Sequence, residues 1–134
     1  MILTKTNLLF GKDYSRKKDK MENVQFNEWQ KLDLRVGEII DIEDIEGADK
    51  LYKLTIDIGP EKRILVAGIK EFYSKDDLKG RKCVVFANLE PKTLRGVQSQ
   101  GMILAAVSKN DKGEESQVQL LQPDSDIDVG SKIC

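Results

Sequence analysis

The sequence NLEPKTLRGVQSQGM, residues 88–102, separates two short apolar runs and decides how the rest of the chain is interpreted. The flanking runs, 84–87 and 102–107, are short and apolar enough to be buried strands. Between them, Pro91, Gly96 and Gly101 interrupt regular structure, while amides, hydroxyls and cations supply polar groups. A long polar connection of this kind is typical of a binding loop. An ordinary hairpin loop that happens to carry Lys92 and Arg95 fits the composition equally well.

Alternating apolar residues predict three strands before this stretch. Positions 32, 34, 36, 40 and 42 share one face of a long first strand, in which Gly37 indicates a bulge or a sharp bend. A second strand is predicted over 52–58, and a third, buried on both faces, over 63–69. Ser74 and Asp77 have capping-box spacing for a short helix that Gly80 would stop. Residues 110–113 predict a hairpin turn that leads to apolar residues at 118–121.

These elements predict an all-β domain. We expect a five-stranded Greek-key barrel of the oligonucleotide/oligosaccharide-binding type (the OB-fold), with a short helix between strands 3 and 4 and a C-terminal extension. In that barrel, residues 47–50 and 89–101 are rim loops. The cations expected to share one rim are Arg35, Lys53, Lys92 and Arg95.

The segment before the first strand divides at about residue 25. Residues 1–25 are expected to be a flexible basic extension, and residues 26–134 the folded domain. Phe26, Trp29 and Leu32 fall on one side of a short helix, so we expect the only tryptophan to cover the core rather than to stack on a base. The extension is either an arm that reaches phosphates or a disordered tail that precedes a true start at Met21.

Charge is unevenly distributed along the chain. Residues 1–20 hold six cations and two carboxylates, a net +4, so the remainder carries −5 to give the total of −1. An acidic body excludes a general coat for nucleic acid, which requires broad positive potential. Any nucleic-acid site must therefore be a local patch.

Several function classes are disfavoured by what the sequence lacks. The chain has no histidine, the commonest general base and metal ligand, and it shows no nucleophile elbow or phosphate loop. We therefore expect no enzymatic activity, no metal and no cofactor. No apolar run approaches the roughly 18 residues of a membrane span. Cys83 and Cys134 lack metal-type spacing, and Cys83 is expected to pack as a small apolar side chain in a cytoplasmic protein.

Five blocks of the sequence, in order, are similar to one known family. The blocks are LDLRVGEI (32–39), ADKLY (48–52), AGI (67–69), NLEPK (88–92), and RGV (95–97) continuing to SQGM (99–102). They resemble the tRNA-binding domain found at the C-terminus of many methionyl-tRNA synthetases, in a synthetase-associated cytokine and as free-standing proteins. The resemblance extends from about residue 26 to 133. It implies the OB-fold barrel, homodimers and recognition of tRNA shape near the outer corner.

The resemblance also implies site residues. Asn88, Ser99 and Met102 would contact tRNA, Gln100 would bond ribose or base edges as one of the amides, and Lys50 would contact a phosphate. The strand faces and charges add Arg35, Lys53, Lys92 and Arg95 to this tRNA-binding set. We expect Arg95 and Ser99 at loops or strand exteriors and Met102 to be partly buried. The family usually has His-Pro where this chain has Glu46-Gly47, so the rim turn there differs.

The favoured hypothesis is a non-catalytic tRNA-binding module that acts as an accessory (beta-type) subunit and delivers tRNA to methionyl-tRNA synthetase. We expect a homodimer, in which apolar residues at 127, 129 and 133 complete a two-fold contact or instead pack as a tail on their own barrel. The alternative is an export-type chaperone of the same family that binds unfolded polypeptides. An enzyme is the third and least supported class.

Overall fold

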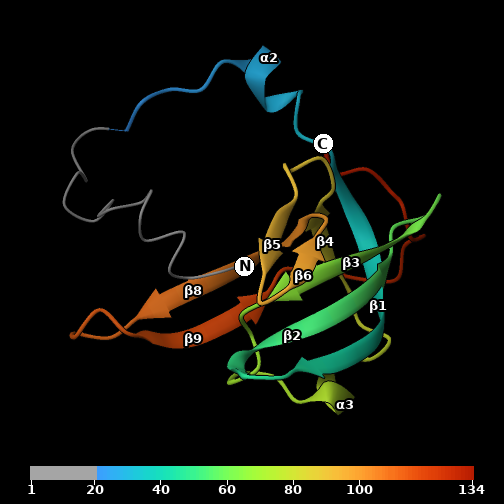
Figure 1. Ribbon diagram of the computed structural model, residues 1–134. Helices are drawn as coiled ribbons and strands as arrows, with labels where there is room; N and C mark the ends of the chain where they lie inside the picture. Colours follow the sequence, from blue (N-terminus) through green and yellow to red (C-terminus); the bar gives the residue numbers. More distant parts are fainter. Residues whose placement is uncertain (1–20) are drawn as a thin grey trace.

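The computed structural model describes residues 21–134, which fold around a five-stranded antiparallel sheet (Figure 1). In chain order its strands are β1 (Leu34–Ile45), β2 (Ala48–Asp57), β3 (Lys62–Ala67), β4 (Lys82–Phe86) and β7 (Met102–Ile103). They lie in the order β3-β2-β1-β4-β7. Two ribbons complete the strands: β5 (Lys92–Leu94) with β6 (Val97–Ser99), and β8 (Ala105–Lys109) with β9 (Glu115–Leu120).

The all-β prediction is confirmed, with a short helix between the third and fourth strands. The described helices are single turns, α2 (Phe26–Trp29) and α3 (Lys75–Leu78). The Ser74 hydroxyl accepts from Asp77 N–H at 3.2 Å and forms the predicted capping box, and Gly80 follows with a φ of 83°. Among the strands of residues 21–134, no continuous ladder closes the sheet into a barrel, because β3 and β7 are its two ends.

The main core is built on alternate residues of β2 and on the residue that follows the strand. Tyr52, Leu54, Ile56 and Ile58 are all under 5% exposed, as their period of two predicts. They pack in one cluster with side chains from β1, β3, β4, α3 and β9. Burial of each large apolar side chain contributes about 1.5–3 kcal/mol, so this cluster is a main source of the stability of the domain.

The bulge in β1 is not where the sequence predicted it. The register against β2 shifts between Ile39 and Asp41, not at Gly37. Ile39 is fully buried and Ile40 only half-buried, so the expected inward position of Ile40 is also wrong. Gly37 serves close packing instead: a Cβ there would lie 2.7 Å from Cγ2 of Ile56 and 2.9 Å from Cγ2 of Val85.

Helix α2 does not cover the core. Phe26 is 70% exposed and Trp29 is 37% exposed, and neither belongs to a buried cluster formed by the described residues. The expectation of a tryptophan lid is therefore wrong. The physical reason is that α2 is a single turn and lies at the end of the molecule away from α3, beyond the start of β1 (Figure 1).

The C-terminal segment pairs with β1. Ser131 O accepts from Val36 N–H at 2.8 Å, and Ile133 N–H donates to Leu34 O at 2.8 Å. An antiparallel bridge joins Arg35 and Lys132 between these bonds. This segment thus packs on its own chain, while Ile127 remains 46% exposed.

The basic residues 1–20 lie outside the described part of the chain. Among residues 21–134, no helix is long and apolar enough to cross a membrane.

Candidate nucleic-acid interface

The central stretch forms a β-hairpin rather than an irregular loop. Leu94 pairs with Val97, which leaves Arg95 and Gly96 as a two-residue turn with φ values of 51° and 79°. Two successive positive φ values are typical of the type I′ turn, whose twist matches that of the flanking strands. Arg95 is therefore exposed at the tip of a defined hairpin.

The underside of this hairpin is apolar. Leu94 and Val97 pack on a second buried cluster made by Ile45, Ala48 and Val66. The hairpin is thus held against β1, β2 and β3 by its side chains. Its polar groups face outward from a fixed base.

Ser99 is buried, which contradicts the expectation that it lies on a loop or strand exterior. Its side chain is only 3% exposed. The hydroxyl accepts a bond from Val66 N–H at 2.9 Å and donates one to Gly101 O at 3.1 Å. Gln100 is half-buried, and its Oε1 accepts from Ile64 N–H at 3.0 Å.

A row of residues runs from β2 to β5 across the hairpin. Lys53 is paired with Val66, Val66 is bonded to Ser99, and Ser99 is paired with Lys92. Lys53 also lies 3.7 Å from a carboxylate oxygen of Glu43. An exposed pair of this kind contributes about 0–1 kcal/mol, so a phosphate can compete for the lysine.

An open hollow of about 340 Å³ lies beside this row. Its lining residues are Lys53, Ile64, Gly96, Val97, Gln98 and Gln100. It combines a cation, the exposed Gln98 amide and an apolar floor, the groups that hold a splayed nucleotide. Lys53 and Gln100 of the predicted set therefore line one hollow, and Lys92 and Arg95 lie on the hairpin beside it.

Arg35 and Asn88 form a separate group at the start of β1. Arg35 Nε and Nη2 each donate to a carboxylate oxygen of Asp33 at 2.9 Å. This bidentate bond holds the pKa of Asp33 below its ordinary value. Asn88 Oδ1 accepts from Asp33 N–H at 2.8 Å, and its Nδ2 donates to Lys31 O at 2.7 Å. Both side chains are thus engaged in fixing the chain before β1.

Lys50 and Met102 lie elsewhere. Lys50 is exposed near the start of β2, where its carbonyl accepts from Lys70 N–H and its charge acts on the carboxyl of Glu115 in β9. Met102 in β7 pairs with Phe86 and is half-buried, as expected. No described contact brings either residue to the hairpin.

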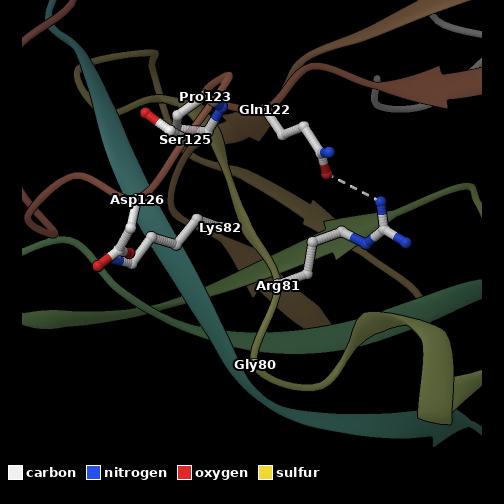
Figure 2. Close-up of a pocket in the computed structure, with 7 residues that line it drawn as sticks. All are labelled: Gly80, Arg81, Lys82, Gln122, Pro123, Ser125 and Asp126. Atoms are coloured by element: carbon white, nitrogen blue, oxygen red, sulfur yellow. Dashed lines mark hydrogen bonds and ion pairs between the residues drawn. The ribbon is translucent and has the colours of Figure 1, made fainter.

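A second hollow, of about 330 Å³, involves cations that are already paired (Figure 2). Arg81 Nη1 donates to Gln122 Oε1 at 3.0 Å, and its guanidinium lies 5.2 Å from the centre of the Tyr73 ring. Lys82 bonds a carboxylate oxygen of Asp126 at 2.7 Å. The C-terminal segment therefore supplies a partner to each of the two cations that line this hollow.

Sequence reasoning missed Arg63 and Gln98. Arg63 Nη1 donates to the carbonyl oxygens of Ala87 and Gln100, the latter at 3.2 Å, although its strand was predicted to be buried on both faces. Gln98 is exposed opposite Thr93 on the hairpin. Recognition of a hairpin turn at Arg95–Gly96 would have placed Gln98 beside the cations.

A family model described as "Putative tRNA binding domain" matches residues 34–132, from the first residue of β1 to the C-terminal segment. The chain belongs to this family. It is 52% identical over 122 residues to a methionine–tRNA ligase from Thermococcus onnurineus, which covers 91% of this chain and 16% of the ligase. A methionine–tRNA ligase from Methanocaldococcus jannaschii is 46% identical over 91% of this chain and 18% of its own length. The chain thus spans about one sixth of the length of these ligases.

Solved structures support the same placement of this tRNA-binding domain. A MetRS-related protein from Pyrococcus horikoshii superposes with a TM-score of 0.75 at 33% identity, covering 85% of this chain and all of that one. A CsaA chaperone protein from Picrophilus torridus superposes with a TM-score of 0.71 at 32% identity, over 84% of this chain and all of its own. The two solved structures thus carry different descriptions, one of a MetRS-related protein and one of a chaperone.

Proposed function

We propose that this chain is a non-catalytic tRNA-binding module and that the β5–β6 hairpin is its principal contact. The observation that carries the proposal is the fixed hairpin, which presents Arg95 at its tip, Lys92 on its first strand and the hollow beside Lys53. Phosphates are held by such cations without sequence preference, and amides beside them bond ribose or base edges. A small cationic patch on an acidic body suits recognition of a folded shape.

Asn88, Ser99, Gln100 and Met102 support this site in different ways. Asn88 and Ser99 have their polar groups engaged within the chain, so we assign them to holding the site. Arg35 is paired with Asp33, and Lys50 lies apart from the hairpin. Both would contact tRNA only if the bound tRNA extends across the sheet. A tRNA has such dimensions.

We further propose that the chain serves methionyl-tRNA synthetase as an accessory subunit in the cytoplasm. The similarity to segments of methionine–tRNA ligases supports this role. Attachment of a weak tRNA site to a catalytic partner raises the effective tRNA concentration and gains about 10²–10⁴ in avidity without new contacts. The module would act as a homodimer, which doubles the number of hairpins per complex.

The primary experiment compares folded tRNA with single-stranded RNA of equal length in gel-shift titrations at three salt concentrations. We expect tighter binding of tRNA and a slope of log affinity against log salt of about −2 to −4, because few phosphates are contacted. Equal affinity for the two RNAs would refute shape recognition. A flat salt dependence would refute the phosphate site.

The accessory role requires a separate measurement. Sedimentation of the purified chain at micromolar concentration tests the homodimer, and addition of purified methionyl-tRNA synthetase tests the complex. We expect a dimer that co-sediments with the synthetase. A monomer, or failure to associate with the synthetase, would remove the corresponding part of the proposal and leave tRNA binding intact.

A chaperone is the second candidate because of the similarity to CsaA proteins. The described surface also exposes Met21, Val24 and Phe26, each at least 70% accessible. An unfolded polypeptide could contact such apolar side chains. Suppression of aggregation of an unfolded model substrate, undiminished by excess tRNA, would favour this function over the first.

A further inference from the structure

Within residues 21–134, one edge of β3 has no partner strand. Its other edge pairs with β2, from Tyr52–Ala67 to Asp57–Lys62. The free edge presents the N–H and C=O of Ile64 and the N–H of Val66. Exposed edge groups of this kind must be covered or paired, because they otherwise cost free energy or recruit another strand.

Two residues of the SQGM block occupy this edge. Gln100 N–H donates to Ile64 O at 2.8 Å, and Gln100 Oε1 accepts from Ile64 N–H at 3.0 Å. Ser99 Oγ accepts from Val66 N–H at 2.9 Å. Two of the three bonds therefore use side-chain oxygens where a neighbouring strand would supply carbonyls.

The backbone beyond Gln100 explains why side chains are needed. Gly101 has a φ of 146°, and a Cβ there would lie 2.9 Å from Phe86 O. The chain turns away from β3 at this point to pair with β4 as β7. Arg63, from β3 itself, fastens the turn by donating to Gln100 O and Ala87 O.

We infer that Ser99 and Gln100 are positioning residues, which set the β5–β6 hairpin on the edge of β3 and thereby hold Lys92 and Arg95 in register with Lys53. This inference rests on the proposed function. Ser99 is buried and has bonds in both directions, so its hydroxyl has no access to RNA. The Oε1 atom of Gln100 is engaged as well. Their contribution to binding is therefore made through the cations of the hairpin.

The test is a double-mutant cycle on tRNA affinity, with the full chain. Gln100→Met keeps the length of the side chain and removes its acceptor, and Ser99→Ala removes the hydroxyl. We expect each to weaken tRNA binding by about three- to tenfold. In a background that already carries Lys92→Ala and Arg95→Asn, each should have almost no effect, because no hairpin cation remains to be positioned.

Amide hydrogen exchange of the free protein gives a readout that does not depend on RNA. Gln100→Met should accelerate exchange of the Ile64 amide, and Ser99→Ala that of Val66. The Leu65 amide, which faces β2 by the alternation of the strand, should remain protected. Gln119→Met on β9 is the matched control and should change neither exchange nor binding. Ser99→Thr keeps the acceptor and should restore much of the affinity.

Three results would overturn the positioning role. If each substitution lowers tRNA affinity by the same factor in the Lys92→Ala, Arg95→Asn background as in the unaltered chain, the inference is overturned. Ser99 or Gln100 would then contact RNA independently of the hairpin cations. Accelerated exchange with unchanged affinity would also overturn it, because the edge closure would then be structural only. Failure of the unaltered chain to bind tRNA would overturn the proposed function itself and the positioning role with it.

Discussion

Arg95 combines a strained backbone position with an exposed cation. Its φ of 51° lies in the left-handed region, where asparagine and glycine are tolerated better than arginine. An arginine that occupies such a turn at a cost in stability is suited to a binding role. The charge, rather than the conformation, is the property to test.

Arg95→Asn should therefore separate binding from stability. We expect tRNA affinity to fall by about 1–2 kcal/mol and the salt slope to flatten by about one unit, because one phosphate contact is lost. The melting temperature should stay the same or rise. Lys112→Ala, in the turn of the other ribbon, is the matched control and should leave affinity unchanged. Affinity of the Arg95 variant equal to that of the unaltered chain would exclude the hairpin tip as a contact.

Asn88 holds in place the segment that leads from α2 into β1. Its amide bonds Lys31 O and its carbonyl oxygen bonds Asp33 N–H. Asn88→Ala should release α2 and cost about 1 kcal/mol of stability. Limited trypsin digestion followed by mass spectrometry should show faster cleavage at Lys31. Unchanged cleavage, together with weaker tRNA binding, would instead assign Asn88 to the RNA contact.

Periodicity predicted the elements that depend on local sequence. The alternation of β2, the buried second half of β3 and the capped helix α3 follow from side-chain patterns within each segment. The bulge at Ile40 could not be located, because it depends on how β1 is shared between β2 and β4. Trp29 was misplaced for a similar reason: a helical face predicts a buried side only if another element covers it.

The candidate site shows the same division. Lys53, Lys92 and Arg95 were identified as cations, and their place on or beside the hairpin follows from strand register. Ser99 was expected at the exterior because serine in a polar stretch is usually exposed. Its burial depends on the unpaired edge of β3, which lies more than 30 residues earlier in the chain. No local pattern contains that information.

The stability of the folded domain depends on pH through carboxylates in ion pairs. The pKa of Asp33 is lowered by its bonds to Arg35, and those of Asp44 and Asp126 by lysines that bond them. A lowered pKa in the folded state means that the unfolded chain binds protons more readily. The stabilisation is present above the ordinary pKa of about 4 and is lost as the pH falls through the folded values.

We therefore expect the melting temperature to fall as the pH is lowered from about 5 to 2. Asp33→Asn should lower the melting temperature near neutral pH and reduce the additional loss in acid, because one of the titrating groups is gone. Asp41→Asn, on β1, controls for the change in net charge. If the plots of melting temperature against pH are parallel for the unaltered chain and the Asp33 variant, this assignment is wrong.

The pairing of the C-terminal segment with the start of β1 brings the two ends of the folded domain together. The Ile133 N–H donates a hydrogen bond to Leu34 O, so the start of β1 and the C-terminal segment lie side by side. The two ends could therefore be joined by a linker, and new chain ends created in an exposed turn. A circular permutant that joins residue 134 to residue 31 by a short glycine–serine linker, and begins at Lys112 in an exposed turn, should melt cooperatively and retain its RNA affinity. The same permutation opened at Leu54, within the core, should not fold. A module with this geometry can be carried at an end or in a surface loop of a larger protein without a change in its own structure.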